Sequence, residues 1–363
     1  MFGSPSSAIG SWILNVESEA APPRRKCSQP SDPPSDATRP ATSLVDLTSS
    51  ASFMHVALVD ILDDAESVLG KPAFDLYCRL AVHSAGASVI PRVVKADIES
   101  SIRGRLLGLA DHNFFDDQRP ECDIRDEYRS LQRVLLSVHD FIADQDYEPA
   151  WNDQVHSRVL EAALPNRKSV WFRNVTKADI SPKDLIPRHS LGGNLQSKMV
   201  DYAIYLEQTE DMRDRARQAL AKEAHSRPPT DVPWSVNHTT YPPLRSRPIA
   251  VSIETKTPSG KYDEAVAQLA IWGAAHLARL NRLVPPGTSL PTLPLVLVSG
   301  TEWNLYFISL DVSANKNKIF GSFCLGDTKS LLGVYRLLQS ARLLADWADS
   351  SLREWWDSVL SAD

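Results

Sequence analysis

Glu254 and Lys256 end an apolar run of mostly β-branched residues that begins at Ile249. Because side chains alternate between the two faces of a strand, both charged groups would leave the same face of one strand. Ion pairs are costly to place against a buried element, so this pair needs a reason. One reason is a salt bridge at the rim of a sheet, where the strand meets solvent. The other is a site that uses the carboxylate and the ammonium for chemistry.

A second β-prone run, residues 198–206, contains one acid, Asp201. If the two strands pair, Asp201 and Glu254 converge and Lys256 lies beside them. Two carboxylates at such a short separation repel each other unless a cation lies between them. Carboxylate oxygens suit Mg²⁺ or Mn²⁺. A metal ion held by Asp201 and Glu254, with Lys256 adjacent, could orient a water molecule and stabilise charge on a phosphate during phosphodiester hydrolysis.

The order of these motifs resembles the PD-(D/E)XK nuclease superfamily, in which an Asp and a Glu-x-Lys lie on neighbouring strands and hold the catalytic metal. Asp201 followed by Glu254-Thr255-Lys256 matches that pattern. The longer series of motifs around them resembles the nuclease-like branch of the superfamily that is common in filamentous fungi. One departure is that Val200 precedes the Asp, where the superfamily commonly has Pro. The matching pieces span about residues 148–363 and comprise Trp151-Asn152, Val155-His156-Ser157 and residues 198–202, 235–239, 241–245 and 268–272.

The resemblance implies a metal-dependent nuclease acting on DNA or RNA. Asp201 and Glu254 would coordinate the metal, and Lys256 would position the water or stabilise the developing charge. In one branch of the superfamily a Gln-x-x-x-Tyr helix follows the Lys strand and supports the site. Here Gln268 is followed by Trp272 in place of the Tyr. Gln268, the fourth predicted site residue, could orient Lys256, a substrate phosphate or only a backbone carbonyl.

A helix is predicted over residues 147–164, and its polar residues define a second candidate face. Glu148, Asn152 and His156 follow each other at i, i+4 and i+8, which gathers them on one side of the helix. In the superfamily the helix before the Asp strand often contributes a polar residue, commonly Glu, to the metal site. Glu148 or His156 could serve in this way. A polar face hydrogen-bonded to neighbours or water explains the spacing equally well, so neither residue joins the predicted catalytic set.

These motifs need a sheet with flanking helices. Strands are predicted near residues 169–174, 198–206, 249–256, 294–299, 303–310 and 319–325, and helices over 207–225, 262–283 and 328–360. The predicted fold class is α/β, or α+β by another counting, with a restriction-endonuclease-like core built on a mixed central sheet. Residues 146–363 form this nuclease-like domain. Residues 51–145 form a helical region with helices over 55–69, 74–87, 90–109 and 127–143. The Ser- and Pro-rich residues 1–50 are expected to be disordered.

Composition narrows the choices of partner and compartment. The 363 residues carry a formal charge of −6, which does not suit a protein coated in nucleic acid, although a local basic groove suffices for a nuclease. Aromatic and basic residues interleave over 227–247, where they could grip a nucleic-acid strand or simply pack a long connection onto the core. Four widely spaced cysteines indicate neither a zinc site nor a disulfide framework, so we expect an intracellular protein of the nucleus or cytoplasm. No run approaches membrane-spanning length, so no membrane partner is expected.

Other catalytic signatures are missing from the sequence. It has no Gly-x-Ser-x-Gly elbow, no His-Glu-x-x-His helix and no dinucleotide-binding glycine pattern. Two alternatives to a nuclease stay open: the same fold used as a catalytically inactive nucleic-acid or protein-binding module, and a scaffold repurposed for other chemistry. The sequence does not distinguish DNA from RNA or predict an oligomeric state. The separation of the Asp201 and Glu254 carboxylates would distinguish a metal-dependent nuclease from these two alternatives.

Overall fold

The runs that contain Asp201 and Glu254 lie side by side in a mixed β-sheet. The computed structural model describes residues 54–57, 64–100, 108–165, 167–187, 199–225, 234–311 and 316–360, all within one compact unit. In that part of the chain the main sheet has seven strands in the order β1-β9-β8-β7-β6-β5-β4. β6 is antiparallel to β5 and parallel to β7. The strands are β1 (Met54–Ala57), β4 (Val170–Asn174), β5 (Tyr202–Leu206), β6 (Ile249–Lys256), β7 (Leu293–Ser299), β8 (Glu302–Asp311) and β9 (Lys316–Asp327).

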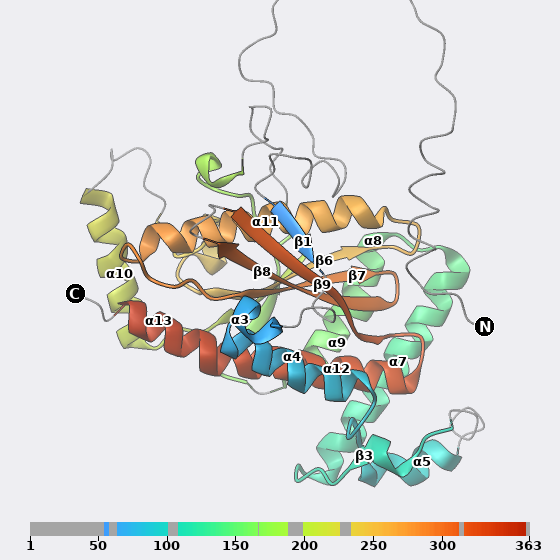
Figure 1. Ribbon diagram of the computed structural model, residues 1–363. Coiled ribbons are helices and arrows are strands. Elements are labelled where there is room, and N and C mark those ends of the chain that lie inside the picture. The colour runs from blue at the N-terminus through green and yellow to red at the C-terminus, as the bar shows by residue number, and fades with distance from the viewer. Residues whose placement is uncertain are drawn as a thin grey trace, which may run out of the picture. The chain divides into compact units, whose positions relative to one another are not determined.

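Helices cover both faces of this sheet (Figure 1). α11 (Tyr262–Leu283) packs on β6, β7 and β8, while α12 (Leu331–Trp347) and α4 (Lys71–Ser84) pack on β9. α11 is apolar nearly all round, as a helix laid on a buried sheet must be. Trp272 donates its indole N–H to Ser252 Oγ on β6 at 3.0 Å. The prediction of an α/β fold with a mixed sheet flanked by helices is confirmed.

The remaining helices connect or buttress these layers. No helix among the described residues is both long enough and apolar enough to cross a bilayer. The helix predicted over 147–164 is real but contains a π-helical turn, η4, and the C-terminal helix is interrupted by another, η7. The elements are α3 (Ala65–Leu69), α5 (Lys95–Ser100), α7 (Glu121–Asp144), α8 (Glu148–Trp151), η4 (Asn152–His156), α9 (Ser157–Ala163), α10 (Glu210–His225), η7 (Ala348–Leu352) and α13 (Arg353–Leu360), with 3₁₀ turns at Arg92–Val94, Asp111–Asn113, Lys183–Leu185 and Pro242–Leu244.

The region before residue 145 is only partly helical. The helix predicted from residue 55 is wrong at its start, because Met54–Ala57 is a strand that pairs in parallel with β9. The helix predicted over 90–109 is also wrong at its start, where β2 (Ile90–Pro91) pairs with β3 (Phe114–Phe115) in a separate small sheet. Both strands form through partners distant in sequence, which local apolar spacing does not reveal. The tail of residues 1–50 lies outside the described residues, and the predicted domain boundaries stay predictions.

A buried ion pair joins α10 to α11. Arg279 on α11 is fully buried, and its guanidinium donates to both carboxylate oxygens of Glu223 on α10, at 2.7 and 2.8 Å. The same guanidinium donates to the carbonyl of Ser235 at 2.8 Å. One side chain therefore fastens two helices and the segment that leads towards β6. Such bidentate geometry is where Arg is most effective.

The segment 234–247 packs onto the core in its first half. Asn237 donates its side-chain amide to the carbonyls of Leu244 and Arg247. The His238 ring is fully buried and stacks on His276 with ring centroids 4.7 Å apart. Burial lowers the pKa of both imidazoles, so they are neutral. Residues 235–239 therefore pack onto the core, and whether the rest of 227–247 contacts nucleic acid stays a prediction.

Candidate active site

The end of β6 places a carboxylate in the interior of the protein. The Glu254 side chain is fully buried, and its Oε1 accepts a hydrogen bond from Lys256 Nζ at 2.5 Å. Lys256 is partly exposed and lies 3.7 Å from Glu148 Oε2 on α8. Because Glu254 is buried, the pair is not a simple salt bridge at the rim of the sheet. The ammonium instead lies between an interior carboxylate and one that is partly open to solvent.

Asp201 lies one residue before β5 and faces the same end of β6. Its main-chain N–H donates to the carbonyl of Ile253 at 3.0 Å, which continues the antiparallel pairing of β5 with β6. The Asp201 side chain is nearly buried, and Oδ2 lies 2.9 Å from both the main-chain N and the hydroxyl of Thr255. Strand pairing therefore brings Asp201 beside the Glu254-Thr255-Lys256 segment, as the sequence predicts.

The charged groups influence one another's protonation. Burial raises the pKa of Glu254 to about 8, the Asp201 charge adds to that shift, and Lys256 opposes it. Burial also raises the pKa of Asp201, against hydrogen bonds from Thr255 and Asn152 that lower it. For Lys256, burial alone would lower the pKa, but Glu254, Glu148 and Asp201 together raise it. The ammonium is therefore charged, and the three carboxyls and the ammonium form one electrostatic unit.

The helix before the Asp strand contributes Glu148 and Asn152 but not His156. The pKa of Glu148 is raised by burial, and the nearby Lys256 opposes this shift. Asn152 Oδ1 lies 2.9 Å from Thr255 Oγ1. The His156 ring is buried, stacks against Trp151 and meets Trp303 edge-on, and burial lowers its pKa to about 3. The predicted polar face is therefore split, and His156 belongs to an aromatic core.

Asn152 and Thr255 are site neighbours outside the predicted catalytic set, although Asn152 lies on the predicted polar face of the helix. The spacing from Glu148 to Asn152 was the available signal for the first, since both lie one helical turn apart. Thr255 stands between Glu254 and Lys256 but alternates to the opposite strand face, so period-two alternation gives no signal for it. Its hydroxyl nevertheless contacts Asp201, one residue before β5, and Asn152, the first residue of η4.

Gln268 contacts the chain that leads into Asp201. Its Nε2 donates to the carbonyl of Met199 at 2.5 Å, two residues before Asp201. Three roles were considered for Gln268, and the structure shows one of them, a hydrogen bond to a backbone carbonyl. The amide therefore ties α11 to the segment that positions Asp201.

Replacing Gln268 by Leu is expected to lower the free energy of unfolding by about 1 kcal/mol, the usual net value of one such hydrogen bond. Urea unfolding of the full chain measures this difference. The control is Gln132→Leu, which makes the same chemical change at an exposed position of α7 and should alter stability by less than about 0.5 kcal/mol. Equal effects at the two positions would show that the Met199 contact is unimportant.

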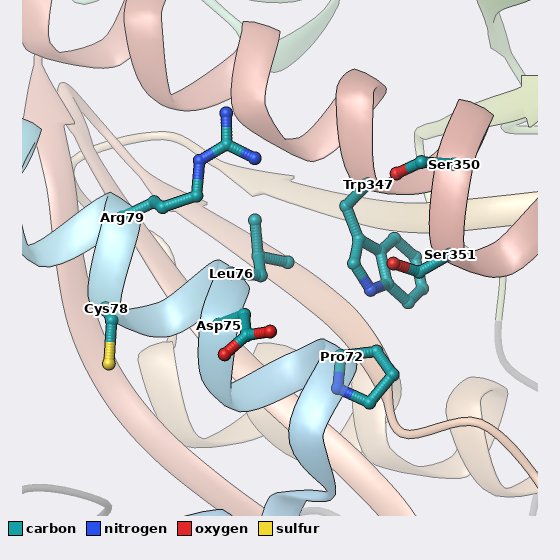
Figure 2. Close-up of a pocket in the computed structure, with 8 residues that line it drawn as sticks. All are labelled: Pro72, Asp75, Leu76, Cys78, Arg79, Trp347, Ser350 and Ser351. Carbon is teal, nitrogen blue, oxygen red and sulfur yellow. The ribbon is translucent and has the colours of Figure 1, made fainter.

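A surface cavity of about 460 Å³ lies away from these residues, between α4 and the turn η7. Figure 2 shows residues that line it, with Asp75, Leu76 and Arg79 on α4 across from the Trp347 indole. None of the predicted site residues lines this cavity. The candidate active site is therefore the cluster at the end of β6.

A family profile of the PD-(D/E)XK nuclease superfamily matches residues 104–355, well over half of the chain. The chain belongs to the PD-(D/E)XK nuclease superfamily. The match includes Asp201 and the Glu254-Thr255-Lys256 segment, and it starts upstream of residue 146, where the nuclease-like domain was predicted to begin. A search of curated proteins gives no match to this chain.

PD-(D/E)XK nucleases generally use divalent metal ions. Within the described residues, no three His, Cys, Asp or Glu side chains are grouped closely enough to hold a metal ion. Glu254 Oε2, however, is buried without a hydrogen-bond partner, and a buried unpaired carboxylate oxygen is costly. A cation would satisfy that oxygen, and two carboxylates are the ligand type that Mg²⁺ or Mn²⁺ prefers. The residues at the end of β6 therefore fit a divalent cation.

Proposed function

We propose that this protein is a metal-dependent nuclease that hydrolyses phosphodiester bonds of DNA or RNA, with Mg²⁺ or Mn²⁺ held by Asp201 and Glu254. The observation that carries the proposal is the unpartnered Oε2 of Glu254, buried within reach of the Asp201 charge and beside Lys256. A fold kept only for packing would gain stability by replacing such a carboxylate with an apolar side chain. Membership of a nuclease superfamily supports the same reading.

Each residue has a distinct part in the proposed reaction. When bound, the metal would lower the pKa of a water molecule and neutralise charge on the phosphate. The Lys256 ammonium, held charged by its carboxylate neighbours, would donate to a phosphate oxygen or position the attacking water. Glu148 would limit where that ammonium can lie, because it is the second carboxylate near Nζ. Gln268 would support Asp201 through the Met199 carbonyl.

Metal binding and strand cleavage test this proposal together. Calorimetry with Mg²⁺ and with Mn²⁺ should give heat for the wild type and none for Asp201→Asn. Cleavage of single- and double-stranded DNA and RNA should need the ion and fail in the variant. The control is Asp75→Asn, which removes an exposed carboxylate on α4 far from the site residues in the sequence. Metal binding without cleavage would favour the inactive binding module, and absence of both in the wild type would end the nuclease proposal.

The affinity for the metal should depend steeply on pH. Because the pKa of Glu254 is raised to about 8, the metal must displace a proton from this carboxyl at lower pH. One displaced proton weakens apparent affinity about tenfold for each pH unit below 8, and the dependence should flatten above it. Calorimetry at pH 6, 7, 8 and 9 measures the slope, and titration in buffers of different ionisation enthalpy counts the protons. An affinity that does not change between pH 6 and 8 would contradict the assignment of Glu254 as a ligand.

A further inference from the structure

A chain of buried polar groups runs from η4 to Asp201. Asn152 Oδ1, Thr255 Oγ1 and Asp201 Oδ2 follow one another at 2.9 Å each. Thr255 is fully buried, and Asn152 and Asp201 are nearly so. The main-chain N–H of Thr255 also donates to Asp201 Oδ2, at 2.9 Å. Polar groups this deeply buried are retained only when they satisfy one another.

The Thr255 hydroxyl lies between two acceptor oxygens, one on Asn152 and one on Asp201. The Thr255 hydroxyl has one hydrogen, so it donates either to Asp201 or to Asn152. If it donates to Asp201, the hydroxyl fixes the carboxylate directly. If it donates to Asn152 Oδ1, the main-chain N–H of Thr255 still donates to Asp201 Oδ2 at 2.9 Å. In both arrangements Thr255 Oγ1 lies 2.9 Å from Asn152 and from Asp201, so the three side chains form one buried polar group.

The π-helical turn η4 positions Asn152 beside Thr255. The main-chain carbonyl of Asn152 accepts the N–H of Ser157, five residues later, in place of the usual partner four residues later. The same carbonyl accepts a hydrogen bond from the Tyr202 hydroxyl at 2.5 Å. Tyr202 directly follows Asp201. The turn and the Asp strand are therefore tied by both the backbone and the side chain of Asn152.

We propose that Asn152 and Thr255 are positioning residues that hold Oδ2 of Asp201 and so present the other carboxylate oxygen to the metal. This inference rests on the proposed function. Thr255 occupies the variable place between the Glu and the Lys of the motif, and here that place supports the neighbouring strand's Asp. Neither residue touches the substrate or the metal in this scheme. They restrict the rotation of Asp201, as residues behind metal ligands do.

Calorimetry with Mn²⁺ tests the hydroxyl. Thr255→Val removes it while keeping the shape of the side chain, and should raise the Kd about 10- to 100-fold, the usual effect of losing a group that orients a ligand. Thr255→Ser restores the hydroxyl and should return the Kd to within about threefold of the wild type. The control is Thr257→Val, beyond the end of β6, where the hydroxyl contacts only Ser259 among the described groups. Unchanged affinity in Thr255→Val, with only a lower Tm, would assign a merely structural role and overturn the proposal.

A double variant tests whether Asn152 and Thr255 act on Asp201 as one linked pair. Asn152→Ala should weaken Mn²⁺ binding to the same degree as Thr255→Val, and the double variant should be no weaker than either. Losses that multiply in the double variant would overturn the proposal. If the wild type binds neither Mn²⁺ nor Mg²⁺, the proposed function fails and this inference fails with it. If the wild type binds the ion and both single variants bind it equally well, the inference alone is overturned.

Discussion

Glu254→Gln should strongly slow metal-dependent cleavage and yet stabilise the metal-free protein. The amide keeps the shape of the side chain but cannot act as a charged ligand. The cleavage rate should therefore fall about a thousandfold, which corresponds to a loss of several kcal/mol of transition-state stabilisation. Stability should rise because the buried carboxyl, with its pKa raised to about 8, resists ionisation in the folded state but not in the unfolded chain. We expect a gain of about 2 kcal/mol at pH 7, after allowing for the lost contact with Lys256.

The sign of the pH dependence follows from the same shift. Between the unfolded pKa of about 4.3 and the folded pKa of about 8, folded Glu254 holds a proton that the unfolded chain releases. The metal-free wild type should therefore lose stability as pH rises through this range and level off above it. Urea unfolding from pH 5 to 9 should show a weaker slope in Glu254→Gln and an unchanged slope in Glu302→Gln, which alters an exposed carboxylate. A variant that still binds the metal, or keeps the wild-type slope, would count against the buried ligand.

Glu223→Ala should destabilise the protein by about 3–5 kcal/mol, the range expected when one partner of a buried ion pair is removed. The fully buried guanidinium of Arg279 would then lie inside the protein without its carboxylate partner. Ser235 would still accept from it, but one neutral carbonyl does not replace a bidentate carboxylate. The segment leading to β6 would loosen along with α10.

Urea unfolding with a matched surface pair tests this expectation. Asp75→Ala breaks the exposed Lys71–Asp75 pair on α4, which should cost less than about 0.5 kcal/mol. The double variant Glu223→Leu with Arg279→Met should recover most of the lost stability, because no unpaired charge is left in the interior. A single variant within 1 kcal/mol of the wild type would mean that water reaches Arg279 and replaces the carboxylate.

The sequence predicts the centre of the fold well because its signals there are local. Residues 262–283 form a helix with the predicted ends, and β6 covers the predicted run of residues 249–256. Period-two alternation correctly puts Glu254 and Lys256 together, and pairing of β5 with β6 brings Asp201 to them. The sequence therefore predicts that Asp201, Glu254 and Lys256 lie together. Whether these residues bind a metal stays a prediction for the experiments above.

Local periodicity fails where the backbone departs from regular geometry or pairs at long range. Helical spacing puts Glu148, Asn152 and His156 on one face, but the turn η4 takes in one more residue and turns His156 into the aromatic core. Glu148 and Asn152, at or before the start of the turn, stay with the site. Met54–Ala57 has too few residues to show a period, and only its pairing with β9 makes it a strand.

The position of that short strand affects how the protein can be shortened. The superfamily match starts at residue 104, which leaves out both β1 and α4. β1 pairs with β9, and the buried Leu76 and Leu80 of α4 belong to the same core as α12. A protein cut back to the matched residues would present an open sheet edge and an uncovered apolar helix, both of which invite self-association. The smallest stable form of this protein is therefore expected to be longer than the segment by which its family is recognised.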